Sequence, residues 1–141
     1  MKHILTALFL TSGTTVMAQN MPSDVSDMIA KIRLEEVKWH PGDKQADLEG
    51  KLAGTWVEID FHRDGGLEEI ETKHGGLFPA SAIAAIVPEV LASSADYPSD
   101  ASFTKIEFDA DQYEIEGRTA QGEWFEAKFD GRGRLEKWDR N

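Results

Sequence analysis

Cysteine is absent from the 141-residue sequence, and basic residues are scarce. Without cysteine the chain can form no disulfide, zinc–thiolate site, iron–sulfur cluster or catalytic thiol. Lys and Arg number 15 against 26 Asp and Glu, which gives a net charge of −11. Because affinity for phosphate backbones and anionic membrane surfaces comes from dense Lys and Arg, we expect neither nucleic acid nor a membrane surface as a partner.

Long apolar runs are also lacking, and the most prominent one lies at the N-terminus. It extends from Ile4 to Leu10, follows Lys2, and leads to a small residue, Ala18. This run is shorter than the roughly 20 residues that span a bilayer, and its flanks are typical of a secretory signal peptide. We therefore predict a signal peptide over residues 1–18, cleaved after Ala18. The remainder would be periplasmic or secreted, with no membrane insertion after cleavage.

What the sequence does contain is an internal repeat. Segments 56–71 and 124–139 align at a constant offset without a gap, and six of their 16 positions are identical. Chance would give about one identity, so a duplication is the better interpretation. It divides the chain after the signal into a first unit, 19–76, and a second unit, 77–141, which we expect to form one compact domain. The identical pairs are Trp56/Trp124, Glu58/Glu126, Phe61/Phe129, Gly65/Gly133, Leu67/Leu135 and Glu68/Glu136.

Alternation of apolar and polar residues predicts strands in both units. The predicted strands are 34–39, 47–52, 55–62 and 67–72 in the first unit, and 103–109, 112–119, 123–129 and 134–139 in the second. Helical spacing of apolar residues predicts helices over 23–32 and 79–93, the latter kinked at Pro88. The predicted fold class is α+β: two tandem units, each a helix followed by an antiparallel β-meander of three to four strands, with the helices packed on one sheet face. Whether the units share one continuous sheet stays open.

The second unit resembles the PepSY-like family of exported bacterial proteins. The resemblance rests on Phe78-Pro79 before a predicted helix, on 103–107, 113–116 and 124–130, and on Gly133-Arg134-Leu135. The first unit departs from the pattern, because its helix lacks the Pro and His62 stands where Asp is usual. The tandem arrangement is similar to the β-lactamase-inhibitor-protein-like architecture. The resemblance implies a periplasmic binding or inhibitory module and brings no catalytic residues.

Residues that could carry catalysis are few. His40, His62 and His74 lack the spacing of a metal site, and no Ser lies in a nucleophile motif. We therefore predict no enzyme, no catalytic residue and no cofactor. Asp109 and Asp111 are the alternative: they could hold a hard cation, although Asp at this spacing is also typical of a hairpin turn.

Two tryptophans are the strongest candidates for binding. By alternation, Trp56 and Trp124 lie on the charged face of their strands, where a large aromatic can anchor a partner. The other interpretation is that both simply cover the sheet. The predicted partner-binding residues are Trp56, Trp124, Glu58, Glu126 and Lys128.

The predicted function is that of a non-enzymatic binding or inhibitory module. Its partner would be a protein or peptide of the bacterial envelope, for example a protease, and the acidic surface of the module would favour a basic partner. The alternative is an exported protein that binds a cation or small ligand through acidic clusters.

Overall fold

The computed structural model describes residues 20–42 and 45–140, so the predicted signal peptide lies outside the described residues. Within them the chain forms one mixed set of strands and short helices, in this order: α1 (Ser23–Ile32), β1 (Glu35–His40), β2 (Asp47–Leu52), β3 (Thr55–Phe61), β4 (Leu67–Thr72), β5 (Phe78–Pro79), the 3₁₀ turn η1 (Ala80–Ile83), α2 (Glu89–Ala92), β6 (Ser102–Phe108), β7 (Gln112–Arg118), β8 (Trp124–Asp130) and β9 (Leu135–Arg140).

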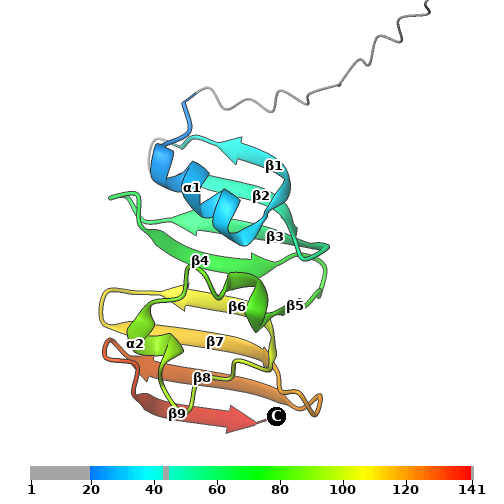
Figure 1. Cartoon of the computed structure of the whole chain (residues 1–141), viewed down its shortest axis with the longest axis vertical. Helices are drawn as coiled ribbons and strands as arrows, with labels where there is room; N and C mark the ends of the chain where they lie inside the picture. The colour runs from blue at the N-terminus through cyan, green and yellow to red at the C-terminus, as the bar shows by residue number, and fades with distance from the viewer. Residues whose placement is uncertain (1–19, 43–44, 141) are drawn as a thin grey trace, which may run out of the picture.

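All nine strands belong to one antiparallel sheet. The order across it is β1-β2-β3-β4-β6-β7-β8-β9, with the two-residue β5 paired to β6. A short ladder between β4 and β6 joins a first half (β1–β4) to a second half (β6–β9), and it pairs Glu69 with Glu107, Ile70 with Ile106, and Glu71 with Lys105. The question that the sequence left open is thereby answered: the two meanders share a single continuous sheet. The helical segments all lie on one face of it (Figure 1).

The core lies between this face and the helical segments. In β3, Val57 and Ile59 are fully buried, whereas their neighbours on the chain are partly exposed. The same alternation holds in β7 and β8. Alternate side chains of a strand point to opposite faces, so an apolar–polar alternation fixes which face is buried. For this reason the predicted strand positions agree with the observed ones to within one residue at each end.

Helix α1 is observed over Ser23–Ile32, as its apolar spacing predicted. Val25, Met28 and Ile32 are its buried residues, at positions that share one helical face. The helix ends at Arg33, which adopts a left-handed conformation (φ 53°) and whose backbone N–H donates to the carbonyl of Ala30. This closing turn directs the chain into β1.

The predicted fold class was wrong. Over residues 20–42 and 45–140 the protein is mostly a nine-stranded antiparallel sheet with a single substantial helix, 45% strand and 15% helix, and not two tandem helix-plus-meander units. The helix expected over 79–93 is reduced to η1 and the four-residue α2. Pro88 has no N–H to donate and disfavours helical geometry at Val87. It therefore separates the turns that follow η1 from α2. Pro79 has an extended conformation (ψ 143°), because fully buried Phe78 pairs with Phe103 in the sheet.

The two meanders nonetheless share their irregular features. Gly50 on β2 and Gly117 on β7 are each buried beside a register shift in the preceding strand. A Cβ on Gly117 would lie 2.1 Å from the carbonyl oxygen of Ser102, and one on Gly50 would lie 2.7 Å from Leu34 Cγ. A side chain fits at neither position without displacement, so both glycines are required for close approach of the strands.

Candidate functional site

The sheet face opposite the helical segments carries the charged side chains, and we call it the open face. Its members follow from the alternation and register of the strands. The acidic residues of the open face are Asp47, Glu49, Glu58, Asp60, Glu69, Glu71, Glu107, Glu114, Glu116, Glu126, Asp130 and Asp139, and its basic residues are Lys38, Lys51, Lys73, Lys105, Arg118, Lys128 and Lys137. Carboxylates therefore outnumber cations on this face.

Both candidate tryptophans lie on the open face and are partly exposed. Trp56 is opposite Lys51 at the start of β3, and Trp124 is opposite Arg118 at the start of β8. Because β3 and β8 run in the same direction in the sheet, the two indoles lie at the same side of the face. They are four strand spacings apart, or about 19 Å at the usual spacing of about 4.8 Å. The arrangement offers two aromatic contact points with a charged strip between them.

Each indole already contacts a cation of its own chain. The Nζ of Lys51 lies 5.2 Å and that of Lys38 5.9 Å from the Trp56 ring centre, and the guanidinium of Arg118 lies 5.8 Å from that of Trp124. Cation–π contacts of this kind contribute about 0.5–1 kcal/mol at exposed sites. They hold the two rings in place on the open face, and the rings remain partly accessible.

The other predicted partner-binding residues also lie on this face, within ion-pair networks. The Nζ of Lys73 lies 3.2 Å from a carboxylate oxygen of Glu58 and also forms an ion pair with Glu49. Lys128 pairs with Glu114 at 3.2 Å across β7 and β8. Glu126 lies between Glu116 and Asp139 in the register of its two neighbours. The predicted set is thus divided between β3 and β8, one group beside each tryptophan.

A row of carboxylates crosses the open face near the strand ends that lie away from the two tryptophans, one on each of five neighbouring strands. The pairing of successive strands places these side chains opposite one another, and we call them the acidic row: Asp47, Asp60, Glu69, Glu107 and Glu114, ended by Lys128. Among the described basic residues, none forms an ion pair with Asp47, Asp60 or Glu69. Like charges directly opposite in a sheet repel, so this row is a region of unbalanced negative potential.

The crowding of the acidic row changes how its carboxyl groups titrate. Burial, the hydrogen bond with Glu107 and its charge raise the pKa of Glu69 to about 7. Burial and the neighbouring carboxylates, Glu58 first among them, raise the pKa of Asp60. For Glu107 burial acts upward, but the hydrogen bonds with Lys105 and Glu69 prevail and lower the pKa. The Glu69–Glu107 pair therefore takes up a proton on Glu69 as the pH falls through about 7.

Lys105 limits the repulsion at the joint between the halves. Its Nζ lies 3.0 Å from a carboxylate oxygen of Glu107 and 3.4 Å from one of Glu116. Burial acts to lower its pKa, but the hydrogen bonds and charges of these two carboxylates prevail and raise it. Lys105 consequently remains charged and stabilises β6 and β7 where the acidic row crosses them.

The alternative cation site is placed at the β6–β7 turn. The backbone N–H of Asp109 donates to the carbonyl of Gln112 over 2.9 Å, a hairpin closure that includes Asp111. No cluster of three or more His, Cys, Asp or Glu suited to a metal ion occurs among residues 20–42 and 45–140. Asp109 instead lies at the rim of a cleft of about 730 Å³ on the helix side, lined also by Leu67, Ile86 and Tyr113.

His62 connects the two halves at this cleft. Its Nε2 is 2.8 Å from the carbonyl oxygen of Phe108, and its Nδ1 is 3.8 Å from Glu68. The hydrogen bond with Phe108 is the main reason that the pKa of His62 is raised. The sequence shows only a scattered histidine here, because the contact depends on the pairing of β4 with β6.

Comparison with known proteins gives no identification: no protein-family model matches the chain, and no curated protein or solved structure is significantly similar to it. The resemblance to PepSY-like proteins thus stays a prediction. None of the helices in the described part of the chain is long and apolar enough to cross a membrane.

Sequence reasoning missed one part of the site. It did not place Glu107 opposite Glu69. A signal was present in the sequence, since both glutamates alternate with buried isoleucines. The partner strand of β4 could not be read from that alternation, because 29 residues separate β4 from β6.

Proposed function

We propose that this protein is an exported, non-enzymatic binding or inhibitory module whose open face binds a basic protein or peptide segment of the cell envelope. The observation that carries the proposal is the acidic row together with two partly exposed tryptophans, which lie to one side of the row on the same helix-free face. Aromatic anchors with surrounding charges are the usual composition of a protein-binding hot spot. The negative potential would steer a cationic segment to the row and make its association sensitive to salt.

The acidic row specifies the chemistry of the partner. Its unpaired carboxylates cost free energy in the isolated protein, because they face one another across the strands. A Lys or Arg side chain placed over Glu69 would offset this repulsion and displace the proton of Glu69. The partner would add apolar contact at the indoles of Trp56 and Trp124, about 19 Å apart. An extended segment of roughly six residues covers this distance.

The experiment is a crosslink in the exporting host with the tagged full chain, followed by mass spectrometry. Three forms are compared: wild type, the Trp56→Ala/Trp124→Ala variant and a matched Val90→Ala variant. Val90 is 46% exposed on the opposite side, in α2. Circular dichroism and thermal unfolding establish that each variant is folded.

The proposal expects one dominant basic partner with wild type and Val90→Ala, strongly reduced with the tryptophan variant. The partner should also dissociate as ionic strength rises. Absence of any partner above background, or equal capture by all three forms, overturns the proposal.

A further inference from the structure

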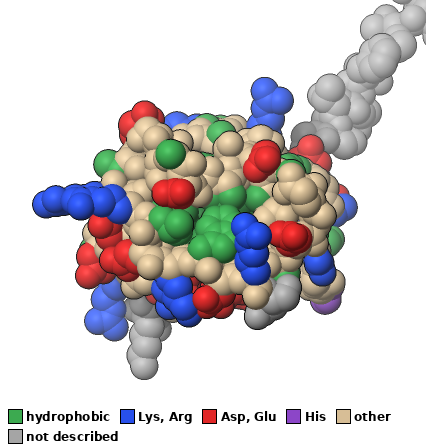
Figure 2. Space-filling view, turned by 90° about the horizontal axis from the view of Figure 1, so that it is seen from below, with side chains coloured by type: hydrophobic (Ala, Val, Ile, Leu, Met, Phe, Trp, Pro, Cys, Tyr) green, Lys and Arg blue, Asp and Glu red, His purple; other side chains and the backbone are tan. Residues whose placement is uncertain are grey.

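Strand β9 forms a free edge of the sheet. Within the described residues it pairs with β8 and with nothing on its other side. A free edge presents unpaired backbone N–H and C=O groups that can pair with another strand. Figure 2 looks onto this end of the molecule and shows hydrophobic side chains at its centre with acidic and basic side chains around them. A groove of about 470 Å³ beside β9 has a mixed lining, with Tyr97 and Trp138 beside charged residues such as Asp100 and Arg140.

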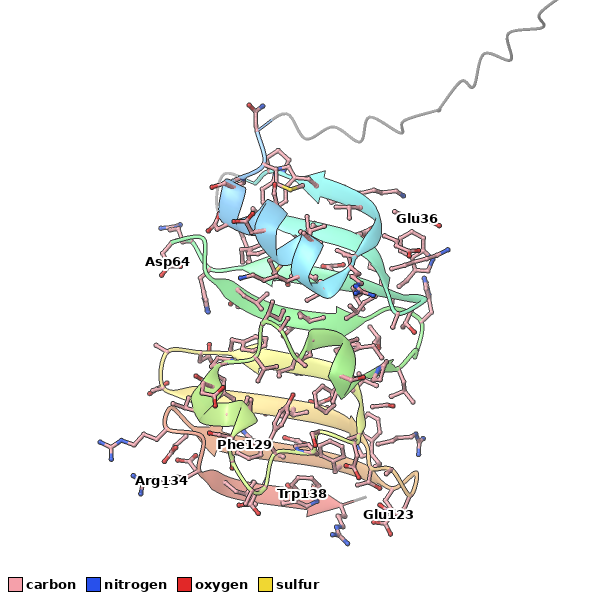
Figure 3. The ribbon with its side chains drawn as sticks, viewed as in Figure 1. Glu36, Asp64, Glu123, Phe129, Arg134 and Trp138 are labelled. Carbon is pink, nitrogen blue, oxygen red and sulfur yellow. The ribbon has the colours of Figure 1, made fainter. Side chains whose placement is uncertain are left out.

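Both edge strands contain a register shift, which in β9 falls at Glu136 and leaves 137–140 in regular pairing with β8, whereas β1 is more irregular. In β1, a register shift and the positive φ of Glu36 (52°) interrupt regular pairing. Bulges of this kind are a common protection of edge strands. The α1 helix also covers the inner face at that end, whereas in the second half the short α2 leaves Trp138 partly exposed (Figures 1 and 3). Trp138 packs on Phe125 with ring centres 4.6 Å apart.

Two charges of β9 do not match the residues directly opposite on β8, although Arg140 pairs with Glu123 at 3.6 Å. Lys137 lies directly opposite Lys128, and Asp139 lies directly opposite Glu126. Both are pairs of like charge, which disfavour pairing in a sheet. Lys137 and Asp139 instead contact each other along the strand, at 2.5 Å. The directly opposite residues of β8 therefore do not account for the placement of Lys137 and Asp139.

The same pattern is complementary to itself. We propose that β9 pairs antiparallel with β9 of a second copy of this chain, about a twofold axis that passes beside Trp138. In this register Lys137 faces Asp139 of the partner subunit, and Asp139 faces Lys137 of the partner subunit. The Lys137–Asp139 pair therefore occurs twice, as a twofold interface requires.

Neighbouring registers are unfavourable. Side chains that face each other in an antiparallel pair lie on the same side of the sheet. A one-residue slip would turn every side chain to the other side, so the alternative registers differ by two residues. A shift that centres the axis on Lys137 sets two lysines together, and a shift that centres it on Asp139 sets two carboxylates together. The register centred on Trp138 avoids both and joins the two partly exposed indoles at the middle of the interface.

This assembly goes beyond the proposed function. It makes one continuous sheet from two copies and places both open faces on the same side. A partner with two basic segments could then bind both faces at once, with the gain in apparent affinity that linked binding gives. The dimer itself does not depend on the open face, so its test is independent of that proposal.

The test is sedimentation equilibrium of the purified protein over a wide concentration range, with charge variants of β9. Lys137→Asp turns two attractive pairs into two repulsive ones, and we expect the dimer dissociation constant to rise roughly tenfold or more. The exchange variant Lys137→Asp/Asp139→Lys restores opposite charges and should restore the dimer. Neither change threatens folding, because Asp at 137 would face Lys128 of its own chain.

Lys31→Asp is the matched control, since it makes the same charge change on exposed α1 and should leave the dissociation constant unchanged. A wild-type protein that stays monomeric at its highest soluble concentration overturns the proposal. So does a dimer that Lys137→Asp leaves intact, or a loss of dimer that the exchange variant does not reverse.

Discussion

Glu69 and Glu107 face each other across the short β4–β6 ladder that joins the two halves of the sheet. Two carboxylates that face each other in this way cannot both ionise without cost. The pKa of Glu69 is accordingly raised to about 7, while that of Glu107 is lowered. The relationship connects the fold to the proposed function, because the ladder that completes the sheet also completes the acidic row. It also gives the folded state a dependence on pH that can be measured.

Glu69→Gln should make the protein more stable above neutral pH. The pKa of Glu69 is about 7 in the folded protein and 4.5 in its ordinary state, so the folded state binds the proton more tightly. Stability from this group is therefore present at low pH and is lost as the pH rises from about 4.5 to 7. Urea unfolding at pH 8 should give the variant a free energy of unfolding up to about 1 kcal/mol greater than that of wild type, which is the upper range for cross-strand pairs. At pH 4 the difference should disappear; an equal effect at both pH values would contradict the assignment.

Lys105→Met should destabilise the protein, because it removes the cation between Glu107 and Glu116. We expect a loss of about 1 kcal/mol in the free energy of unfolding at pH 8, as for a networked but partly exposed pair. Combining it with Glu69→Gln should recover part of the loss, since both residues act on Glu107. A double-mutant cycle measures this coupling, and strict additivity of the two changes would argue against a shared network.

His62 should titrate above the ordinary histidine pKa of 6.5, because its ring is hydrogen-bonded to the carbonyl of Phe108. A raised pKa means that the protonated ring stabilises the folded state at low pH and that this stability is lost as the pH rises through the folded pKa. Nuclear magnetic resonance titration of the imidazole gives the pKa directly. His62→Gln should reduce stability more at pH 5.5 than at pH 8, and the opposite order would contradict the contact.

Gly65 and Gly133 offer a matched pair at equivalent turns. Both have positive φ, at 92° and 79°, but a Cβ on Gly65 meets no atom within 4 Å, whereas one on Gly133 would lie 1.9 Å from the carbonyl oxygen of Val90. Gly65→Ala should cost about 1 kcal/mol for its backbone conformation alone. Gly133→Ala should cost about 1–3 kcal/mol more, because α2 must move. Thermal unfolding compares the two, and equal losses would show that the α2 contact is unimportant.

The sequence by itself determined the strands and the face that each one buries. Alternation in Trp56–Phe61 and Trp124–Phe129 placed both tryptophans on the charged side, because a period of two fixes orientation without knowledge of the neighbours. Apolar spacing likewise determined α1. These are local properties, set by residues a few positions apart.

The tertiary structure decided the second helix, the joint between the halves and the free edge. Phe78 could begin a helix or pair in the sheet, and its burial against Phe103 favoured the sheet at the expense of the helix. The placement of Glu69 opposite Glu107 and the mismatch of Lys137 with Lys128 depend on which strands become neighbours. Pairing between segments distant in the chain is chosen by the free energy of the whole core, and no short window of sequence contains that information.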